Sequence, residues 1–324
     1  MNIQLPTGFV VRSATPDDLP AVVDLMNECT QADIGLRNFS LDWVKRQWDD
    51  DEFHLDTDTW LVADAANQIV GYADFFEETP PEPYEVTSWV RPSLIDTGLG
   101  DYLLHCLDAR AQQAMANAPQ GVEIVMDHGW VYEQSTALRQ RIEKFGYRHI
   151  RTWLRLLIEM TQPPSEPRVP DGIAIRPFRQ GEDDRALYEA WEEAMADEWG
   201  HAVLTYGKWR YYFIDHAGEE DLPYWFLAVD GTQIAGLILG RWRRPGTEDE
   251  GHIRYLGVRP AWRRRGIGLA LLLHSFADFY RRGHPKVGLG VDGTSPTGAE
   301  RLYLKAGMSI ILRSLVYEKV LREK

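Results

Sequence analysis

The 324-residue sequence contains only two cysteines, Cys29 and Cys106, which lie far apart and match no metal-binding spacing. Scarce cysteine argues against a disulfide framework and is typical of a protein kept reduced. No apolar run approaches the roughly 18 residues that a membrane span needs. The first six residues lack the basic and apolar regions of a signal peptide. We therefore expect a cytoplasmic protein without a metal or a membrane partner.

An excess of positive charge is also absent, since the net charge is −14. Residues 1–165 contain 26 acidic and 12 basic residues, whereas residues 166–324 contain 23 of each. A chain with this much negative charge is not expected to bind nucleic acid. The second half nevertheless gathers several arginines within 25 residues: Arg241, Arg243, Arg244, Arg254, Arg259 and Arg263 to Arg265. This clustering predicts a local anion site in that half.

Periodic apolar patterns predict alternating strands and helices in the first half of the chain. The expected strands are 9–12, 60–63, 69–73, 85–90, 122–126 and 152–160, and the expected helices are 15–25, 40–49, 101–116 and 135–145. A stretch with four prolines in ten residues follows, and residues 161–171 are therefore expected to form an extended linker.

The same order then repeats. Residues 225–236 match 60–71, the Gly266-Ile267-Gly268 turn matches Gly98-Leu99-Gly100, and residues 306–308 match 145–147, at offsets between 161 and 168. Offsets this constant indicate a duplicated domain. We predict a mixed α/β (α+β) fold of two tandem domains, 1–160 and 172–324, each with a central mixed β-sheet flanked by helices.

The most informative stretch is Arg263-Arg264-Arg265-Gly266-Ile267-Gly268. It lies between a strand-like run, 253–258, and an amphipathic helix whose apolar face is predicted to contain Leu269, Leu272, Leu273, Phe276 and Tyr280. A helix N-terminus has free N–H groups and a positive dipole end, and glycines let an anion approach the backbone. The alternative is an ordinary tight turn with a solvated basic face.

The Arg263-x-x-Gly266-x-Gly268 motif after Leu256-Gly257-Val258 resembles the acyl-CoA loop of the GNAT acetyltransferase superfamily. A second segment, Ser295-Pro296 through Leu302-Tyr303 to Gly307-Met308, looks like the downstream signature of that family. The tandem architecture is similar to that of mycothiol synthase and its relatives. The resemblance implies acetyl-CoA as the donor, and it implies cofactor contacts from the following residues: Leu256, Gly257, Val258, Arg263, Arg264, Arg265, Gly266, Ile267, Gly268 and Ser295.

The two copies differ at the positions that carry chemistry. Ile95-Asp96-Thr97 replaces the three arginines in the first copy, and Ile142 stands where the second copy has Tyr303. An aspartate beside a diphosphate site is unfavourable. We therefore interpret the first copy as a degenerate domain and the second as the catalytic one.

Three residues are candidates for proton transfer. Tyr303 is expected to protonate the departing thiolate, because a phenol and a thiol have comparable basicity, and Ser295 and Pro296 are expected to start its helix. His252 occupies the place where mycothiol-synthase-like sequences have a glutamate, and Glu250 lies two residues earlier on the same side of the strand. Either could accept a proton from the amine; a chain of water molecules without a single base is the alternative.

An acidic and aromatic segment near the start of the second domain is expected to face the acceptor. We expect the contacts to come from Trp191, Glu198, Trp199 and Tyr206. Such an acidic and aromatic segment would suit an acceptor amine with positive charge. The alternative is an aromatic core with a solvated helix face.

The predicted function is that of a GNAT-type N-acetyltransferase acting on a small-molecule amine. Two other functions stay open: a non-catalytic CoA-binding module, and an enzyme that acetylates a protein amine. The oligomeric state stays open between monomer and homodimer.

Overall fold

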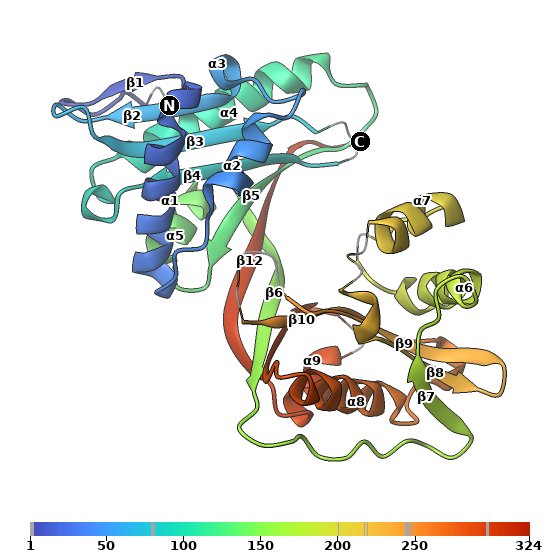
Figure 1. The fold of residues 1–324 in the computed structure, drawn as a ribbon. Coiled ribbons are helices and arrows are strands. Elements are labelled where there is room, and N and C mark those ends of the chain that lie inside the picture. Colours follow the sequence, from blue (N-terminus) through green and yellow to red (C-terminus); the bar gives the residue numbers. More distant parts are fainter. Residues whose placement is uncertain are drawn as a thin grey trace. The chain divides into compact units, whose positions relative to one another are not determined.

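The computed structural model describes residues 3–78, 82–199, 201–216, 218, 220–243, 247, 249–295 and 298–324. Arg244 and Pro296 of the predicted sites lie outside these ranges. The chain forms two compact units, which are described separately: unit 1 comprises Met1–Thr152 with Arg313–Lys324, and unit 2 comprises Trp153–Leu312 (Figure 1). Within the described ranges, no helix is long and apolar enough to cross a membrane.

Unit 1 is built on a mixed sheet. Its elements are β1 (Val10–Arg12), η1 (Pro16–Asp18), α1 (Leu19–Ile34), α2 (Leu41–Trp48), α3 (Leu55–Asp58), β2 (Thr59–Ala63), β3 (Ile69–Phe76), β4 (Tyr84–Val90), η2 (Pro92–Leu94), α4 (Leu99–Asn117), β5 (Ile124–Tyr132), α5 (Thr136–Lys144), the first part of β6 (Arg148–Glu159) and the last part of β12 (Ser309–Arg322). The pairing order is β1-β2-β3-β4-β5-β12, and only β4 and β5 are paired in parallel. One apolar core lies under α4 and another under α1 and α2.

Unit 2 repeats this plan. Its further elements are β7 (Ile173–Pro177), α6 (Asp184–Met195), α7 (Tyr206–Arg210), the π-helical turn η3 (Tyr211–Asp215), η4 (Leu222–Tyr224), β8 (Trp225–Asp230), β9 (Gln233–Arg241), β10 (Gly251–Val258), η5 (Pro260–Trp262), α8 (Ile267–Arg281), β11 (Lys286–Asp292) and α9 (Ala299–Lys305). The order is β6-β11-β10-β9-β8-β7, with β10 and β11 parallel. One core lies under α8 and α9, and the other under α6 and α7.

The two units exchange their last strands. In unit 2, β6 pairs with β11 from Trp153↔Asp292 to Glu159↔Lys286. In unit 1, the end of the chain pairs with β5 from Ser314↔Tyr132 to Arg322↔Ile124. The sequence had assigned 152–160 to the first domain and the chain end to the second. The domain boundaries at 160 and 172 stay a prediction; the pairing shows that each sheet borrows its last strand from the other half.

The predicted helices and strands form, with shifted ends. Thr15 and Asp18 form a capping box at η1, as Thr15 before Pro16 indicated. Helix α1 continues to Ile34, beyond the expected end at residue 25. The apolar stripe of α8 is wider than predicted, because Ala270, Leu271 and Phe279 are also buried beside Leu272 and Phe276. The helix packs on β8, β9, β10 and β11 of unit 2, so more than one narrow stripe is covered.

Candidate active site

A glycine-capped turn forms the N-terminus of α8. Gly266 is its N-cap with φ 88° and ψ 2°, a left-handed conformation that glycine adopts without strain. Arg264 also has a positive φ, 61°, which turns successive N–H groups toward one side in the manner of an anion-binding nest. The first N–H groups of α8 have no intrahelical acceptor. The turn therefore offers backbone donors and the positive end of the helix dipole to an anion.

Arg263 is engaged within the protein. Its Nε donates to Val258 O (3.0 Å), and its guanidinium also contacts Ala194 O (3.3 Å) and forms an ion pair with Asp197. Its backbone N–H donates to Pro260 O (3.2 Å). Arg263 thus ties the end of β10 to the end of α6, and it orients the turn through these contacts.

Two further arginines present their charge to solvent. Arg264 is exposed, and in the part of the chain that the structure describes no acceptor contacts its guanidinium. Arg265 has only a long ion pair with Asp230 (3.9 Å). By contrast, Arg259 pairs closely with Glu193 (2.6 Å) and stacks on Trp262. Arg264 and Arg265 are therefore the arginines of this turn that remain available for phosphates.

The strand before the turn has a hydrogen-bonding edge without a partner strand. β10 pairs with β11 only at Gly251, His252 and Ile253. Beyond Ile253, β10 continues to pair with β9, whereas β11 continues with β6. Alternate backbone groups of residues 255–258 therefore point away from β9, toward the side where β11 has diverged. This is the segment for which the sequence predicted backbone contacts to the donor.

The side chains of this segment serve packing. Leu256 and Val258 pack into the core under α8. A Cβ at Gly257 would lie 2.4 Å from the Met195 side chain and 2.9 Å from Ala194, so only glycine fits against α6. Side-chain burial and exposed backbone groups coexist here, as expected, and the donor contacts stay a prediction.

Tyr303 lies on α9 and is 7% exposed. Burial, and to a smaller extent the charge of Glu198, raises the pKa of its phenol. The hydroxyl therefore stays protonated through the physiological range, as a proton donor must. The raised pKa also makes the phenol a weaker acid, so donation requires a basic acceptor held close to it.

An acidic group accompanies Tyr303. Glu198 is near enough for its charge to act on the phenol. Partial burial raises the pKa of Glu198, and the charges of Asp292 and Asp197 add to this effect while Arg263 opposes it. Asp292 is buried and accepts hydrogen bonds from the N–H (2.8 Å) and hydroxyl (2.5 Å) of Thr294. The charge of Glu198 thus acts on the phenol of Tyr303. The sequence predicted separate roles for these two residues, one at the acceptor and one at the leaving thiolate.

The start of the Tyr303 helix differs from the prediction. The N-cap of α9 is Gly298, with φ 66°, and the helix begins at Ala299. Ser295 lies upstream, where its N–H donates to Asp292 O (3.2 Å) and its C=O accepts from the N–H of Gly298 (3.3 Å). Ser295 as N-cap was therefore wrong, because a turn closes between Ser295 and the helix. A cofactor contact by Ser295 stays a prediction.

The two candidate bases differ in their surroundings. Glu250 is 2% exposed, and its Oε2 forms an ion pair with Arg155 on β6 (2.6 Å). Its other oxygen, Oε1, would lie 2.4 Å from a Cβ at Gly288, so this glycine makes room for the carboxylate. His252 is half-buried and pairs in register with Arg241 and Gly288. Glu250 is occupied by the ion pair, which leaves His252 as the better placed of the two.

The aromatic residues expected at the acceptor take several roles. Trp191 is 5% exposed and packs edge-on against Phe213 and Tyr255, so it belongs to the core under α6. Tyr206 packs on Tyr188 and lies under Arg185, at the contact of α6 with α7. Trp199 is 49% exposed. Of the four residues predicted to touch the acceptor, Glu198 is the one whose charge acts on the phenol of Tyr303; the acceptor contacts stay a prediction.

Unit 1 closes the corresponding positions with its own side chains. Gly98 caps α4 with φ 85° and ψ −1°, almost the conformation of Gly266. Beside it, Arg141 donates to Ile95 O (2.6 Å) and pairs with Asp101 (3.0 Å), and its guanidinium would lie 2.4 Å from a Cβ at Gly100. The glycine turn is therefore preserved, while an arginine of the protein itself occupies its surroundings.

The edge of β4 in unit 1 is also bridged. β4 and β5 pair only from Tyr84 to Val86, as β10 and β11 do. Beyond that point, Ser88 and His128 form a buried hydrogen bond of 2.8 Å, and Ile142, at the position of Tyr303, is fully buried. These contacts support the interpretation of unit 1 as the degenerate copy.

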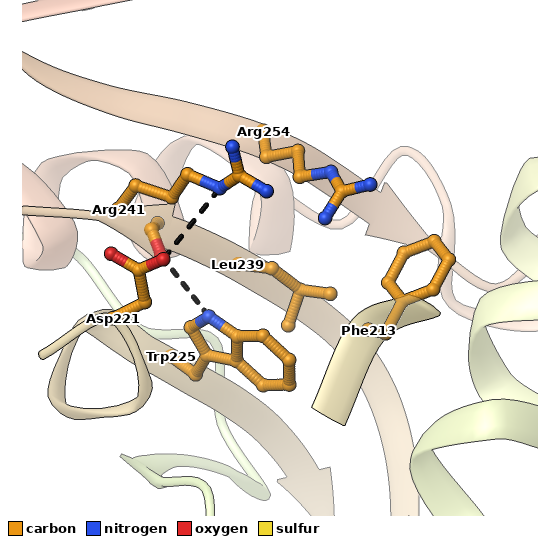
Figure 2. A pocket seen from close by; sticks show the side chains of 7 residues that line it. Phe213, Asp221, Trp225, Leu239, Arg241 and Arg254 are labelled. Carbon is orange, nitrogen blue, oxygen red and sulfur yellow. Dashed lines mark hydrogen bonds and ion pairs between the residues drawn. The ribbon is translucent and has the colours of Figure 1, made fainter. Parts of the chain in front are cut away.

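A pocket on the α6/α7 side of the unit 2 sheet contains two arginines. The sequence indicated these two only as part of a local cluster of positive charge. Arg241 and Arg254 form part of the pocket wall (Figure 2). Arg254 is an extra residue in β10, because the register with β9 shifts between Ile253 and Tyr255. Alternation along a strand gives no signal for such a bulge, so the sequence could not place Arg254 in this pocket.

Comparisons with known proteins agree with this geometry. The family model described as "Acetyltransferase (GNAT) family" matches residues 185–308. The crystal structure of a GCN5-related N-acetyltransferase from Sphaerobacter thermophilus is 34% identical, covers 98% of both chains and superposes with a TM-score of 0.80. This chain belongs to the GNAT acetyltransferase family. The protein is thus an acetyltransferase, and a non-catalytic CoA-binding module is set aside.

Two further similarities concern the whole chain of this GNAT protein. A mycothiol acetyltransferase from Salinispora tropica is 30% identical over 262 residues, which are 77% of this chain and 78% of the relative. A tandem GNAT protein from the clavulanic acid biosynthesis pathway covers 98% of this chain with a TM-score of 0.65 at 14% identity, which shows a shared fold. The tandem arrangement inferred from the internal repeat is therefore confirmed.

Proposed function

We propose that the protein transfers an acetyl group from acetyl-CoA to the amine of a small molecule, at the site in unit 2. The observation that carries this proposal is the end of β10–β11 pairing at Ile253, in the strand that leads through η5 to the glycine-capped N-terminus of α8. An open strand edge offers backbone groups to an extended amide chain, and a helix N-terminus offers donors to a diphosphate. Acetyl-CoA has both parts, in that order along the molecule.

The proposed reaction assigns one task to each group. The neutral amine attacks the thioester carbonyl carbon, the C–N bond forms, and the C–S bond breaks. Tyr303 gives its proton to the leaving sulfur, and the proton lost by the amine passes to His252 or to solvent. Holding the reactants in this geometry accounts for much of the acceleration, and proton transfer from a placed acid adds about 10²- to 10⁴-fold.

The relatives named mycothiol acetyltransferase suggest a small thiol-bearing amine as one acceptor to test. The resemblance to mycothiol-synthase-like sequences implies a glutamate where this chain has His252, and Glu250 is held by Arg155. The acceptor site of this chain therefore differs from theirs at the predicted base. This difference supports a different small amine, and it does not support a protein acceptor.

A thiol-release assay with acetyl-CoA tests the proposal. We expect turnover with members of a small-amine panel, and none above background with peptides that carry only an N-terminal amine or a lysine. Acetyl-CoA binding is measured in parallel by calorimetry. Turnover confined to the peptides would reverse the acceptor class, and an absence of acetyl-CoA binding would overturn the donor as well.

A further inference from the structure

The pocket on the α6/α7 side of the unit 2 sheet has an unusual balance of charge. Its wall is formed by Phe213, Asp221, Trp225, Leu239, Gly240, Arg241 and Arg254. Figure 2 shows Asp221 on one side, Phe213 on the other, and both guanidinium groups above the Trp225 and Leu239 side chains. Two cations therefore share this small space with a single carboxylate and an apolar floor.

Arg254 enters this pocket because of the bulge in β10. The register passes from Ile253↔Gly240 to Tyr255↔Leu239, which leaves Arg254 without an opposite residue. Bulges of this kind re-aim a side chain. The Arg254 guanidinium lies 4.8 Å from the centre of the Phe213 ring and 5.2 Å from that of Tyr255. Within the described ranges, no carboxylate pairs with it.

Arg241 is only partly neutralised. Its Nε lies 3.6 Å from Asp221 Oδ2, and the other oxygen of Asp221 accepts a hydrogen bond from Trp242 N (3.3 Å). Burial lowers the pKa of Arg241, and the charge of Arg254 lowers it further. The charge of Arg241 is thus disfavoured by its burial and by Arg254, so an additional anion beside the two arginines would stabilise it.

The pocket adjoins the place where the acetyl group is transferred. Arg241 pairs in register with His252, the candidate base. Arg254 directly follows Ile253, the last residue of β10 that pairs with β11. A molecule with an amine beside His252 and an anionic group in the pocket needs to span only neighbouring positions of one strand, which are about 3.3 Å apart per residue.

We propose that this pocket binds the carboxylate of the acceptor, so that the substrate class is an amino acid or a closely similar amino carboxylate. This inference rests on the proposed function, which supplies the amine. Forked guanidinium donors match a carboxylate in geometry and charge. The acidic residue Glu198 then complements the ammonium end. The acceptor is thus zwitterionic, where the sequence had suggested only positive charge.

The first experiment compares amino acids with their carboxamides, such as glycine with glycinamide and β-alanine with β-alaninamide. The amide has the less basic amine, so more of it is neutral at a given pH, and amine reactivity alone favours the amide. We expect kcat/KM to be about 10- to 100-fold higher for the acid, the range for losing a charged hydrogen bond. Equal use of acid and amide would overturn the inference while leaving the acetyltransferase proposal intact. A preference for phosphoethanolamine over both would overturn the choice of a carboxylate.

Variants of Arg254 give the second comparison. Arg254→Met is expected to raise KM for the acid about tenfold or more and to abolish discrimination against the amide, with acetyl-CoA affinity unchanged. Arg254→Lys should restore part of the discrimination. The matched control is Arg179→Met, which removes an exposed arginine of the same unit that pairs only with Glu182. Equal losses in the Arg179 and Arg254 variants would assign the effect to overall charge.

A binding measurement keeps the test independent of turnover. Saturation-transfer NMR with propionate and propionamide reports whether the pocket holds a carboxylate that lacks an amine. We expect a signal for propionate that is lost in Arg254→Met and retained in Arg179→Met. Equal signals for propionate and propionamide, or no effect of Arg254→Met on propionate, would contradict the inference even if no acceptor is turned over.

Discussion

Gly98 and Gly266 have the same backbone conformation, with φ 85° and ψ −1° in one and φ 88° and ψ 2° in the other. Gly98 caps the helix that follows β4, and Gly266 caps the helix that follows β10. Around Gly98, Arg141 and Asp101 fill and neutralise the site, whereas the turn at Gly266 has Arg264 and Arg265 beside it. The glycines therefore belong to the fold, and the charged residues distinguish the proposed donor site from the copy that we interpret as degenerate.

This pair offers a matched test. An alanine in a left-handed conformation costs about 1–2 kcal/mol, so Gly98→Ala and Gly266→Ala should each lower the melting temperature by roughly 2–8 °C. Only Gly266→Ala should weaken the binding of acetyl-CoA, because only that turn is proposed to hold the diphosphate. Calorimetric titration of both variants measures this. Equal affinities in the two variants would mean that the α8 turn does not bind the donor.

The arginines of the turn should separate by function. Arg264→Ala is expected to lower the affinity for acetyl-CoA by up to about tenfold. This loss of affinity should be smaller at high salt, because an exposed charge is screened. Arg263→Ala should instead destabilise the protein, since it removes contacts to Val258, Ala194 and Asp197. Thermal melts and titrations at two salt concentrations distinguish these outcomes. A large loss of stability in Arg264→Ala would argue for a structural role there.

Tyr303→Phe should lower kcat by about 10²-fold or more, with acetyl-CoA affinity nearly unchanged. The raised pKa of the phenol also predicts a pH profile. Because the hydroxyl stays protonated, the rate should not fall between pH 8 and pH 10 through loss of the acid. An unchanged kcat in Tyr303→Phe would make Tyr303 a core residue only, as its burial alone would allow.

Unit 1 contains a row of carboxylates with a consequence for stability. Asp127 on β5 pairs in register with Glu85 on β4 and Glu318 on β12. Burial, followed by the charges of Glu318 and Glu85, raises the pKa of Asp127 to about 7. A raised pKa favours the protonated carboxyl in the folded state, so stability is greatest below the unfolded pKa of about 4 and is lost as the pH rises through about 7.

Asp127→Asn should therefore stabilise the protein more at pH 8 than at pH 5. Removing one like-charged neighbour from a row is worth about 1 kcal/mol, which corresponds to roughly 2–4 °C in melting temperature. The control is Asp96→Asn, an exposed carboxylate of the same unit. A gain of the same size at both pH values, or in both variants, would contradict the titration of Asp127.

Local patterns predicted much of the fold. The match of residues 60–71 to 225–236 corresponds to two real hairpins, β2–β3 and β8–β9, because hairpins depend on nearby residues. The exchange of β6 and β12 was missed, since the apolar pattern of a strand does not specify which sheet it joins. The start of α9 was misplaced because Ser295 and Pro296 form a strong cap signal, whereas the chain continues to Gly298 before it turns.

The site was predictable to a similar degree. Comparison of the two copies picked out Arg263, Arg264, Arg265 and Tyr303 from sequence alone, and their roles at the donor stay a prediction. The anchoring role of Arg263 depends on the end of α6, which is nearly 70 residues away in sequence. The ion pair between Glu250 and Arg155 joins residues far apart in the sequence, and the role of Glu250 as a base stays a prediction. Arg254 required the bulge, which is a property of two paired strands.

The central claim is a single donor site per chain, located in unit 2. Calorimetric titration of the full-length protein with acetyl-CoA tests it most directly. We predict a stoichiometry of about one acetyl-CoA per chain. Two sites per chain would contradict the assignment of unit 1 as the degenerate copy, and no binding would contradict the acetyl-CoA site itself.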